Sequence, residues 1–275
     1  MKKALTLLLL AGAMVLVSGC YTNPVTGRKS LVLLTQGEEA KLGAESFQAI
    51  RQKEKVSQDP AANARVQRIG RRIAEAVGNE MPGAKWEFVV FDSKEFNAFA
   101  LPGGKVGVYT GLMQLAENDA ELAAVIGHEI GHVIARHGAE RMSEAMVIAG
   151  VGAVGAAVVE AKTDDPRMRQ LFALAYGAGT TLGRVLPHSR GNETESDRMG
   201  AIYAARAGYD PRAAITFWEK MGAKKRAAGA AGAKLEALLS THPSDEQRIV
   251  QLRALMPQVV PIFEKARAAR SAQPD

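Results

Sequence analysis

Two histidines and the glutamate between them give the stretch His128-Glu129-Ile130-Gly131-His132 the clearest chemistry in this sequence. On a helix with 3.6 residues per turn, His128 and His132 project to the same side, as two ligands of one metal ion must. Glu129 is offset by about 100° and can serve as a base beside the metal without binding it. This arrangement is typical of zinc sites that hydrolyse peptide bonds. Two incidental histidines are the alternative, and the small total of five histidines disfavours it.

The residues around this stretch predict a helix. Asn118, followed three residues later by Glu121, predicts a capping box, and the helix is expected from about 119 to 137. Gly127 and Gly131 each disfavour a helix by up to about 1 kcal/mol relative to alanine. We interpret both glycines as positions where another backbone approaches the metal helix closely.

A zinc site of this kind needs a third protein ligand. His137 follows the pair, but on a continuous helix ended by Gly138 it points away from them, so we interpret it as a solvated residue at the helix end. Downstream, Glu193 and Asp197 share one helical face, whereas Glu195 points nearly opposite. Glu193 could bind the metal while Asp197 accepts the free N–H of a ligand histidine. From spacing alone, a solvated acidic face is equally consistent.

Several segments together resemble metallopeptidase family forty-eight, a group that includes HtpX, the prenyl-protein protease and, most similar here, bacterial lipoprotein peptidases of the BepA and LoiP type. The matching segments lie within residues 23–256: Asn23–Arg28, Asn97–Gly104, His128–His132, Leu186–Gly200 and Ser240–Pro243. One departure is His188, where members of the family often carry an aromatic residue.

The resemblance implies a gluzincin-like zinc metalloendopeptidase. It implies that one Zn²⁺ ion per chain is held by three side chains: His128, His132 and Glu193. It also implies that Glu129 is the general base, that His242 can approach as a fourth, switchable ligand, and that Arg248 stabilises the oxyanion. Without the resemblance, His242 is a turn residue and Arg248 a surface charge.

The periodicity of apolar residues predicts a mainly α-helical fold with a small β-sheet, an α+β fold. The resemblance implies that this fold is of the zincin type, with the histidine pair on a helix. Further helices are expected at 35–56, 60–78, 191–208, 210–226 and 242–255. Strands are expected at Trp86–Phe91, Phe99–Leu101 and Lys105–Tyr109, the last two joined by the turn Pro102-Gly103-Gly104. The apolar run Met146–Val159 is too short to cross a bilayer. We interpret it as a buried helix or a mobile loop over the site, and the alternative is a membrane-facing or lid element.

The N-terminal residues are typical of an export signal. Lys2 and Lys3 precede the apolar run Ala4–Val17, which closes on small residues before Cys20. Cys20 is the only cysteine, so an intramolecular disulfide is excluded. Small residues before a cysteine resemble a bacterial lipobox, in which the thiol is diacylated; a soluble secreted protein is the alternative. Tyr21, in place of aspartate, resembles lipoproteins sorted to the outer membrane.

These features predict four parts: a signal peptide at 1–19, a linker at 20–34, a zinc metallopeptidase domain at 35–256, and a C-terminal helix and tail at 257–275. Removal of the signal leaves about 256 residues, enough for one large domain. It lowers the formal net charge from +6 to about +4, since Lys2 and Lys3 leave. With 5% aromatic residues and no basic stripe beside them, nucleic acid is not an expected partner.

The expected function is cleavage of unfolded or misassembled cell-envelope polypeptides by a lipid-anchored outer-membrane enzyme that faces the periplasm. The strand at 97–101 could hold an extended substrate by strand addition. The alternative is a periplasmic chaperone or assembly factor whose zinc site is occluded by His242. Glu129 distinguishes these two functions, because only an enzyme needs the base.

The lipid anchor can be tested at Cys20. Because two acyl chains give stable membrane anchoring, Cys20→Ser is expected to move the processed protein into the soluble fraction or to block its processing. Fractionation of expressing cells measures this. Wild-type protein recovered entirely in the soluble fraction would refute the lipoprotein assignment.

Overall fold

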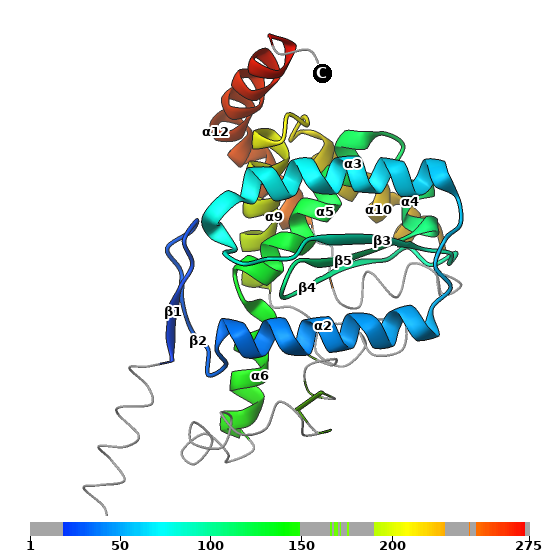
Figure 1. The fold of residues 1–275 in the computed structure, drawn as a ribbon. Coiled ribbons are helices and arrows are strands. Elements are labelled where there is room, and N and C mark those ends of the chain that lie inside the picture. Colours follow the sequence, from blue (N-terminus) through cyan, green and yellow to red (C-terminus); the bar gives the residue numbers. More distant parts are fainter. Residues whose placement is uncertain are drawn as a thin grey trace, which may run out of the picture.

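The computed structural model describes residues 19–148, 190–228 and 246–272, together with His242 and five isolated positions between 166 and 175. The fold is mainly α-helical with two small sheets, as expected (Figure 1). Residues 1–18, His188 and most of the apolar run 146–159 lie outside the described part. Within the described ranges, none of the helices is both long and apolar enough to cross a membrane.

The central sheet has three strands in the order β3-β5-β4. Strand β3 (Glu87–Phe91) runs parallel to β5 (Lys105–Tyr109), and β4 (Ala98–Leu101) pairs antiparallel with β5. The predicted hairpin is therefore confirmed. Its turn has φ values of 83° and 85° at Gly103 and Gly104, a left-handed conformation that glycine adopts without strain.

Two helices close to their predicted bounds cover the sheet: α2 (Gln36–Lys53) and α3 (Pro60–Val77). Residues 88 and 91 of β3 point to opposite faces because side chains alternate along a strand. Phe88 packs against Gly70 of α3, while the Phe91 ring lies 6.5 Å from that of Phe47 on α2. The sheet is thus sandwiched between the two helices (Figure 1).

The metal-motif helix α5 (Asp119–Ile134) packs against α9 (Arg190–Arg206) with very close backbones. A Cβ atom added at Gly127 would lie 2.9 Å from the carbonyl oxygen of Gly200, and one at Gly131 would lie 3.1 Å from that of Ser196. The interpretation of these two glycines as sites of close approach is confirmed. At the start of α5, Asn118 caps the N–H of Glu121, but the Glu121 carboxylate accepts from the N–H of Glu117, so the capping box is only half formed.

The predicted end of this helix at Gly138 is wrong. Helix α5 ends at Ile134, Arg136 adopts a left-handed φ of 57°, and α6 (His137–Ile148) begins at the next residue. Such a conformation costs a residue with a Cβ roughly 1–2 kcal/mol. Contacts outside the helix hold it here, because the Arg136 guanidinium donates to Glu39 and to the carbonyl of Leu34.

The N-terminal segment that we interpreted as a linker is folded. It forms a hairpin of β1 (Cys20–Thr22) and β2 (Lys29–Leu31), and β2 packs against α6. The Tyr21 hydroxyl donates to the carbonyl of Ile134 over 2.6 Å, which ties the hairpin to the end of α5.

The break predicted between a helix ending near residue 255 and a C-terminal helix starting at 257 is also wrong. After α10 (Ala213–Ala228), helix α12 runs from Glu246 to Ser271 through Pro257 and Pro261. Each proline removes one helical N–H, a local cost that normally ends or kinks a helix. Burial of Val259 and Phe263 stabilises the continuation. The shorter elements are α4 (Thr110–Leu115) and a 3₁₀ turn (Gly78–Glu80).

The close approach of α5 and α9 predicts a sharp cost for a methyl group. In Gly200→Ala the new Cβ would lie 2.7 Å from the backbone nitrogen of His128, so the helices must separate, and we expect a loss of about 1–3 kcal/mol in the free energy of unfolding. The matched control is Gly222→Ala in α10, where the nearest atom is the flexible Arg226 side chain at 3.4 Å. The control should be neutral or stabilising by up to about 1 kcal/mol. Urea unfolding compares the two, and equal midpoints would contradict the argument.

Candidate active site

Four side chains from three parts of the chain converge in the protein interior. His128 and His132 come from α5, Glu193 from the first turn of α9, and His242 from the segment before α12. All four are buried, and one ligand atom of each lies within 4.8 Å of the others. The structure thus brings together the four residues that the family resemblance implies as ligands.

The distances within this group are close to those between the ligand atoms of a four-coordinate metal ion. His128 Nε2 lies 3.1 Å from His132 Nε2 and 3.3 Å from His242 Nδ1. Glu193 Oε1 lies 3.2 Å from His132 Nε2 and 3.1 Å from His242 Nδ1, and Glu193 Oε2 lies 3.4 Å from His128 Nε2. The centre of a regular tetrahedron with an edge of about 3.3 Å is about 2.0 Å from each corner, which is the usual zinc-to-nitrogen and zinc-to-oxygen length. The donor set and its spacing therefore fit zinc.

Glu129 lies beside this group. Its Oε1 atom is 3.5 Å from Nε2 of His242, and its side chain is buried. Burial raises the pKa of the Glu129 carboxyl above its usual value. A base that must accept a proton and then return it works best with such a raised pKa.

A buried arginine links the two carboxylates of the α9 face. Nε and Nη2 of Arg248 donate to Asp197 over 2.7 Å each, and Nη1 lies 2.8 Å from Glu193 Oε2. Asp197 Oδ1 also lies 2.9 Å from Nδ1 of His128, a position from which a carboxylate can orient a ligand histidine. Burial alone would raise the pKa of Glu193, but His242 and Arg248 hold it well below the usual range.

The surroundings of Arg248 bear on its expected role. Its guanidinium stacks 4.0 Å from the centre of the Trp218 ring and is occupied by Glu193 and Asp197. In this structure Arg248 compensates buried negative charge, and its contact with an oxyanion stays a prediction. Trp218, on α10, also packs edge-on against the His128 ring at 5.7 Å, and no sequence pattern indicated it.

The interpretation of His137 as a solvated residue is wrong. Its side chain is fully buried, with Nδ1 2.9 Å from Nδ1 of His132 and Nε2 2.9 Å from a carboxylate oxygen of Glu195. The left-handed Arg136 turns the chain back and brings His137 behind the metal-ligand pair. Glu195 lies outside the ligand group, as the helical geometry predicted.

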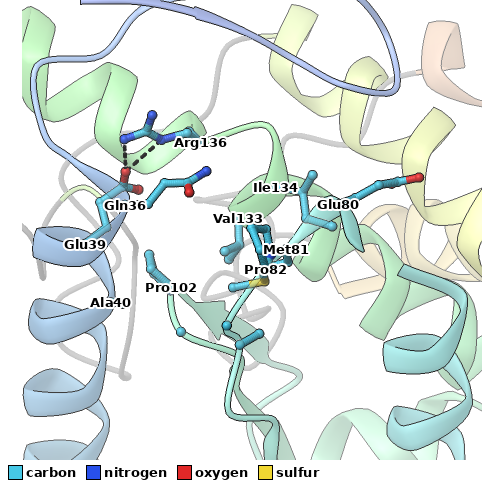
Figure 2. A pocket seen from close by; sticks show the side chains of 13 residues that line it. Gln36, Glu39, Ala40, Glu80, Met81, Pro82, Pro102, Val133, Ile134 and Arg136 are labelled. Carbon is cyan, nitrogen blue, oxygen red and sulfur yellow. Dashed lines mark hydrogen bonds and ion pairs between the residues drawn. The ribbon is translucent and has the colours of Figure 1, made fainter. Parts of the chain in front are cut away.

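A separate surface pocket adjoins the end of α5 (Figure 2). It lies between the first turn of α2, the β4–β5 turn and the loop at 80–84, and it encloses about 480 Å³ open to solvent. Arg136 lines it and is paired with Glu39, as Figure 2 shows. None of the four clustered ligand residues lines this pocket. It is therefore distinct from the candidate active site.

The fold and the site together define a metallopeptidase of the zincin type: a buried histidine pair on one helix, a glutamate from a second helix and an adjacent carboxylate base. The sequence profile of Peptidase family M48 matches residues 60–256, and the chain belongs to this family. The predicted family and the mainly α-helical zincin-type fold are thus confirmed.

Curated relatives carry peptidase names. The chain is 36% identical over 193 residues to mitochondrial metalloendopeptidase OMA1 of Schizosaccharomyces pombe, covering 70% of this chain and 52% of that protein. It is 29% identical over 244 residues to the β-barrel assembly-enhancing protease of Escherichia coli K12, covering 88% and 48%. The bovine metalloendopeptidase OMA1 is 32% identical over 262 residues, covering 92% and 49%. The chain spans about half the length of these relatives.

The buried charges of the site predict the effect of losing Arg248. Arg248→Gln would leave Glu193 and Asp197 without their counter-charge, and we expect the metal-free protein to lose about 3–5 kcal/mol of unfolding free energy. Arg253→Gln, on the same helix, removes an exposed pair with Glu219 and should cost less than about 1 kcal/mol. Urea titration of both variants measures the difference. Similar losses would show that Arg248 does not compensate the buried carboxylates.

Proposed function

We propose that this chain is a zinc-dependent endopeptidase that cleaves unfolded or misassembled polypeptides of the cell envelope. The observation that carries the proposal is the buried, closely spaced set of three histidines and one glutamate, with Glu129 beside it. Membership of Peptidase family M48 and the names of the relatives support the reaction class.

Each residue of the site has a separate role in the proposed hydrolysis. His128, His132 and Glu193 would hold the zinc, and Asp197 would orient His128. When bound, zinc supplies Lewis-acid chemistry, lowering the pKa of water towards about 7 and polarising the scissile carbonyl. Glu129 takes a proton from the attacking water and then delivers it to the leaving amine.

The edge of the sheet supports an extended substrate. Strand β4 pairs with β5 on one side, and in the described part of the chain no strand pairs with its other edge. Helix α5 packs against β4, so a polypeptide added along this edge would run close to the metal helix. Backbone hydrogen bonds then supply affinity with little sequence preference, which favours unfolded chains.

The proposed location is the outer membrane, with the domain facing the periplasm. The support is the signal-like N-terminus with Cys20 after small residues, together with a bacterial relative whose name refers to β-barrel assembly. The OMA1 relatives are mitochondrial by name, so the relatives alone leave the compartment open. Cys20 is exposed, as attachment of a lipid requires.

A second candidate function is favoured by the position of His242. Its Nδ1 atom occupies the fourth corner of the ligand set, where a zinc site needs water for catalysis. A chain held in this arrangement would bind polypeptides without cleaving them, as a chaperone or assembly factor does. In the enzyme, His242 would instead leave this corner when substrate binds.

Two substitutions separate these functions by opposite effects. Glu129→Gln removes the base and leaves the four ligand residues, so it should keep about one zinc per chain and lose cleavage of an unfolded protein. His242→Ala keeps three ligands and opens the fourth position, so basal cleavage should rise. Zinc content by atomic absorption and cleavage of an unfolded substrate measure both effects.

The controls make this experiment decisive. Glu117→Gln changes an exposed carboxylate just before α5 and should behave as wild type, whereas Glu193→Gln removes a ligand and should lose most of the zinc. A zinc-loaded wild type without chelator-sensitive cleavage, unchanged by His242→Ala, would favour the binding protein. Full cleavage by Glu129→Gln would refute the proposed mechanism.

A further inference from the structure

A chain of buried hydrogen bonds leads from the metal-ligand pair to the N-terminal hairpin. His132 Nδ1 lies 2.9 Å from His137 Nδ1, and His137 Nε2 lies 2.9 Å from Glu195 Oε2. Three residues of the β1–β2 turn then donate to the same carboxylate: Asn23, Thr26 and Arg28. Asn23 is 2% exposed and His137 0%, so the protein itself must satisfy these polar groups.

The metal-binding end of this series of hydrogen bonds determines which group donates and which accepts at each step. A neutral histidine that offers Nε2 to a metal carries its proton on Nδ1, and His132 therefore donates to Nδ1 of His137. His137 must then carry its own proton on Nε2, which donates to Glu195. The Glu195 carboxylate can only accept, so it enforces this order.

The N-terminal turn holds Glu195 in place. Asn23 Nδ2 donates to Oε1 over 2.8 Å, and Arg28 Nε donates to Oε2 over 2.5 Å. The Asn23 amide is itself fixed, because its Oδ1 accepts from the N–H groups of Val25 and Thr26. A glutamine at position 195 would place an NH₂ group where one carboxylate oxygen now accepts. In one orientation this NH₂ would face the donor Asn23, and in the other it would face the donors Arg28 and His137.

The same N-terminal region holds the corner that brings His137 to this position. The left-handed Arg136 donates to the carbonyl of Leu34 over 2.5 Å and to Glu39, as Figure 2 shows for the latter. Its guanidinium also lies 5.0 Å from the centre of the Tyr21 ring. Contacts from residues 21–39 thus fix both the backbone before His137 and the carboxylate behind it.

We propose that the Asn23–Arg28 turn is a working part of the metal site: through Glu195 and His137 it fixes the tautomer and ring orientation of His132. Asn23, Thr26, Arg28, Glu195 and His137 are positioning residues that touch neither metal nor substrate. The inference rests on the proposed zinc site. It makes the N-terminal turn, which lies outside the region matched by the family profile, necessary for tight metal binding.

The test measures zinc affinity of the full chain by competition with a chelator of known affinity. Thr26→Val replaces the hydroxyl by a methyl group of the same shape, and Glu195→Gln disturbs the acceptor; each should weaken zinc binding about 10- to 100-fold. Both should still reach one zinc per chain at saturation. Thr26→Ser keeps the hydroxyl, so its zinc affinity should lie within about threefold of wild type.

Glu140→Gln is the matched control. Arg28 pairs with Glu140 through Nη1 and Nη2 at 2.7 and 2.8 Å, so this variant weakens the hairpin's attachment but leaves Glu195 untouched. Its zinc affinity should stay near wild type even if its thermal stability falls. Wild-type affinity in Thr26→Val and Glu195→Gln, or an equal loss in Glu140→Gln, overturns the inference and leaves the zinc site standing. A wild-type chain that binds no zinc overturns both proposals.

Discussion

The contact between the backbones of α5 and α9 is the constraint on which the site depends. At Gly127 and Gly200 the two helices approach so closely that a methyl group would meet main-chain atoms. At this separation a carboxylate from the first turn of α9 reaches two histidines on α5 with ligand spacing. Glycine has a low helix propensity, but these positions require it, because the close approach that forms the candidate metal site leaves no room for a side chain.

Helix α9 buries three carboxylates, and each has a positively charged or imidazole partner from a distant part of the chain. Arg248 of α12 serves both Glu193 and Asp197, whereas Arg28 of the N-terminal turn and His137 serve Glu195. Unpaired, these groups would strongly destabilise the fold. The two ends of the described chain thus converge on one helix, and the site is complete only when both are in place.

Local patterns predicted much of this structure. The histidine spacing, the glycine-rich face of α5 and the β4–β5 hairpin follow from periodicity and turn chemistry, which short stretches of sequence contain. The burial of His137 could not be predicted, because it depends on a left-handed Arg136 that distant residues stabilise. The continuation of α12 past Pro257 likewise depends on tertiary packing that outweighs a local preference. The contacts of Glu195 could not be predicted either, because they depend on the N-terminal turn that packs over this face of α9.

The short distance along the chain between Cys20 and the buried Asn23 limits how far the folded domain can lie from a lipid attached to Cys20. Three residues span at most about 11 Å, and residues 20–22 are already paired in β1. If Cys20 carries the acyl chains, no flexible linker separates the lipid from the folded domain. The domain would then lie directly on the bilayer surface in a nearly fixed orientation. Its encounters would then be confined to the membrane surface, and freely diffusing polypeptides would meet the site far less often.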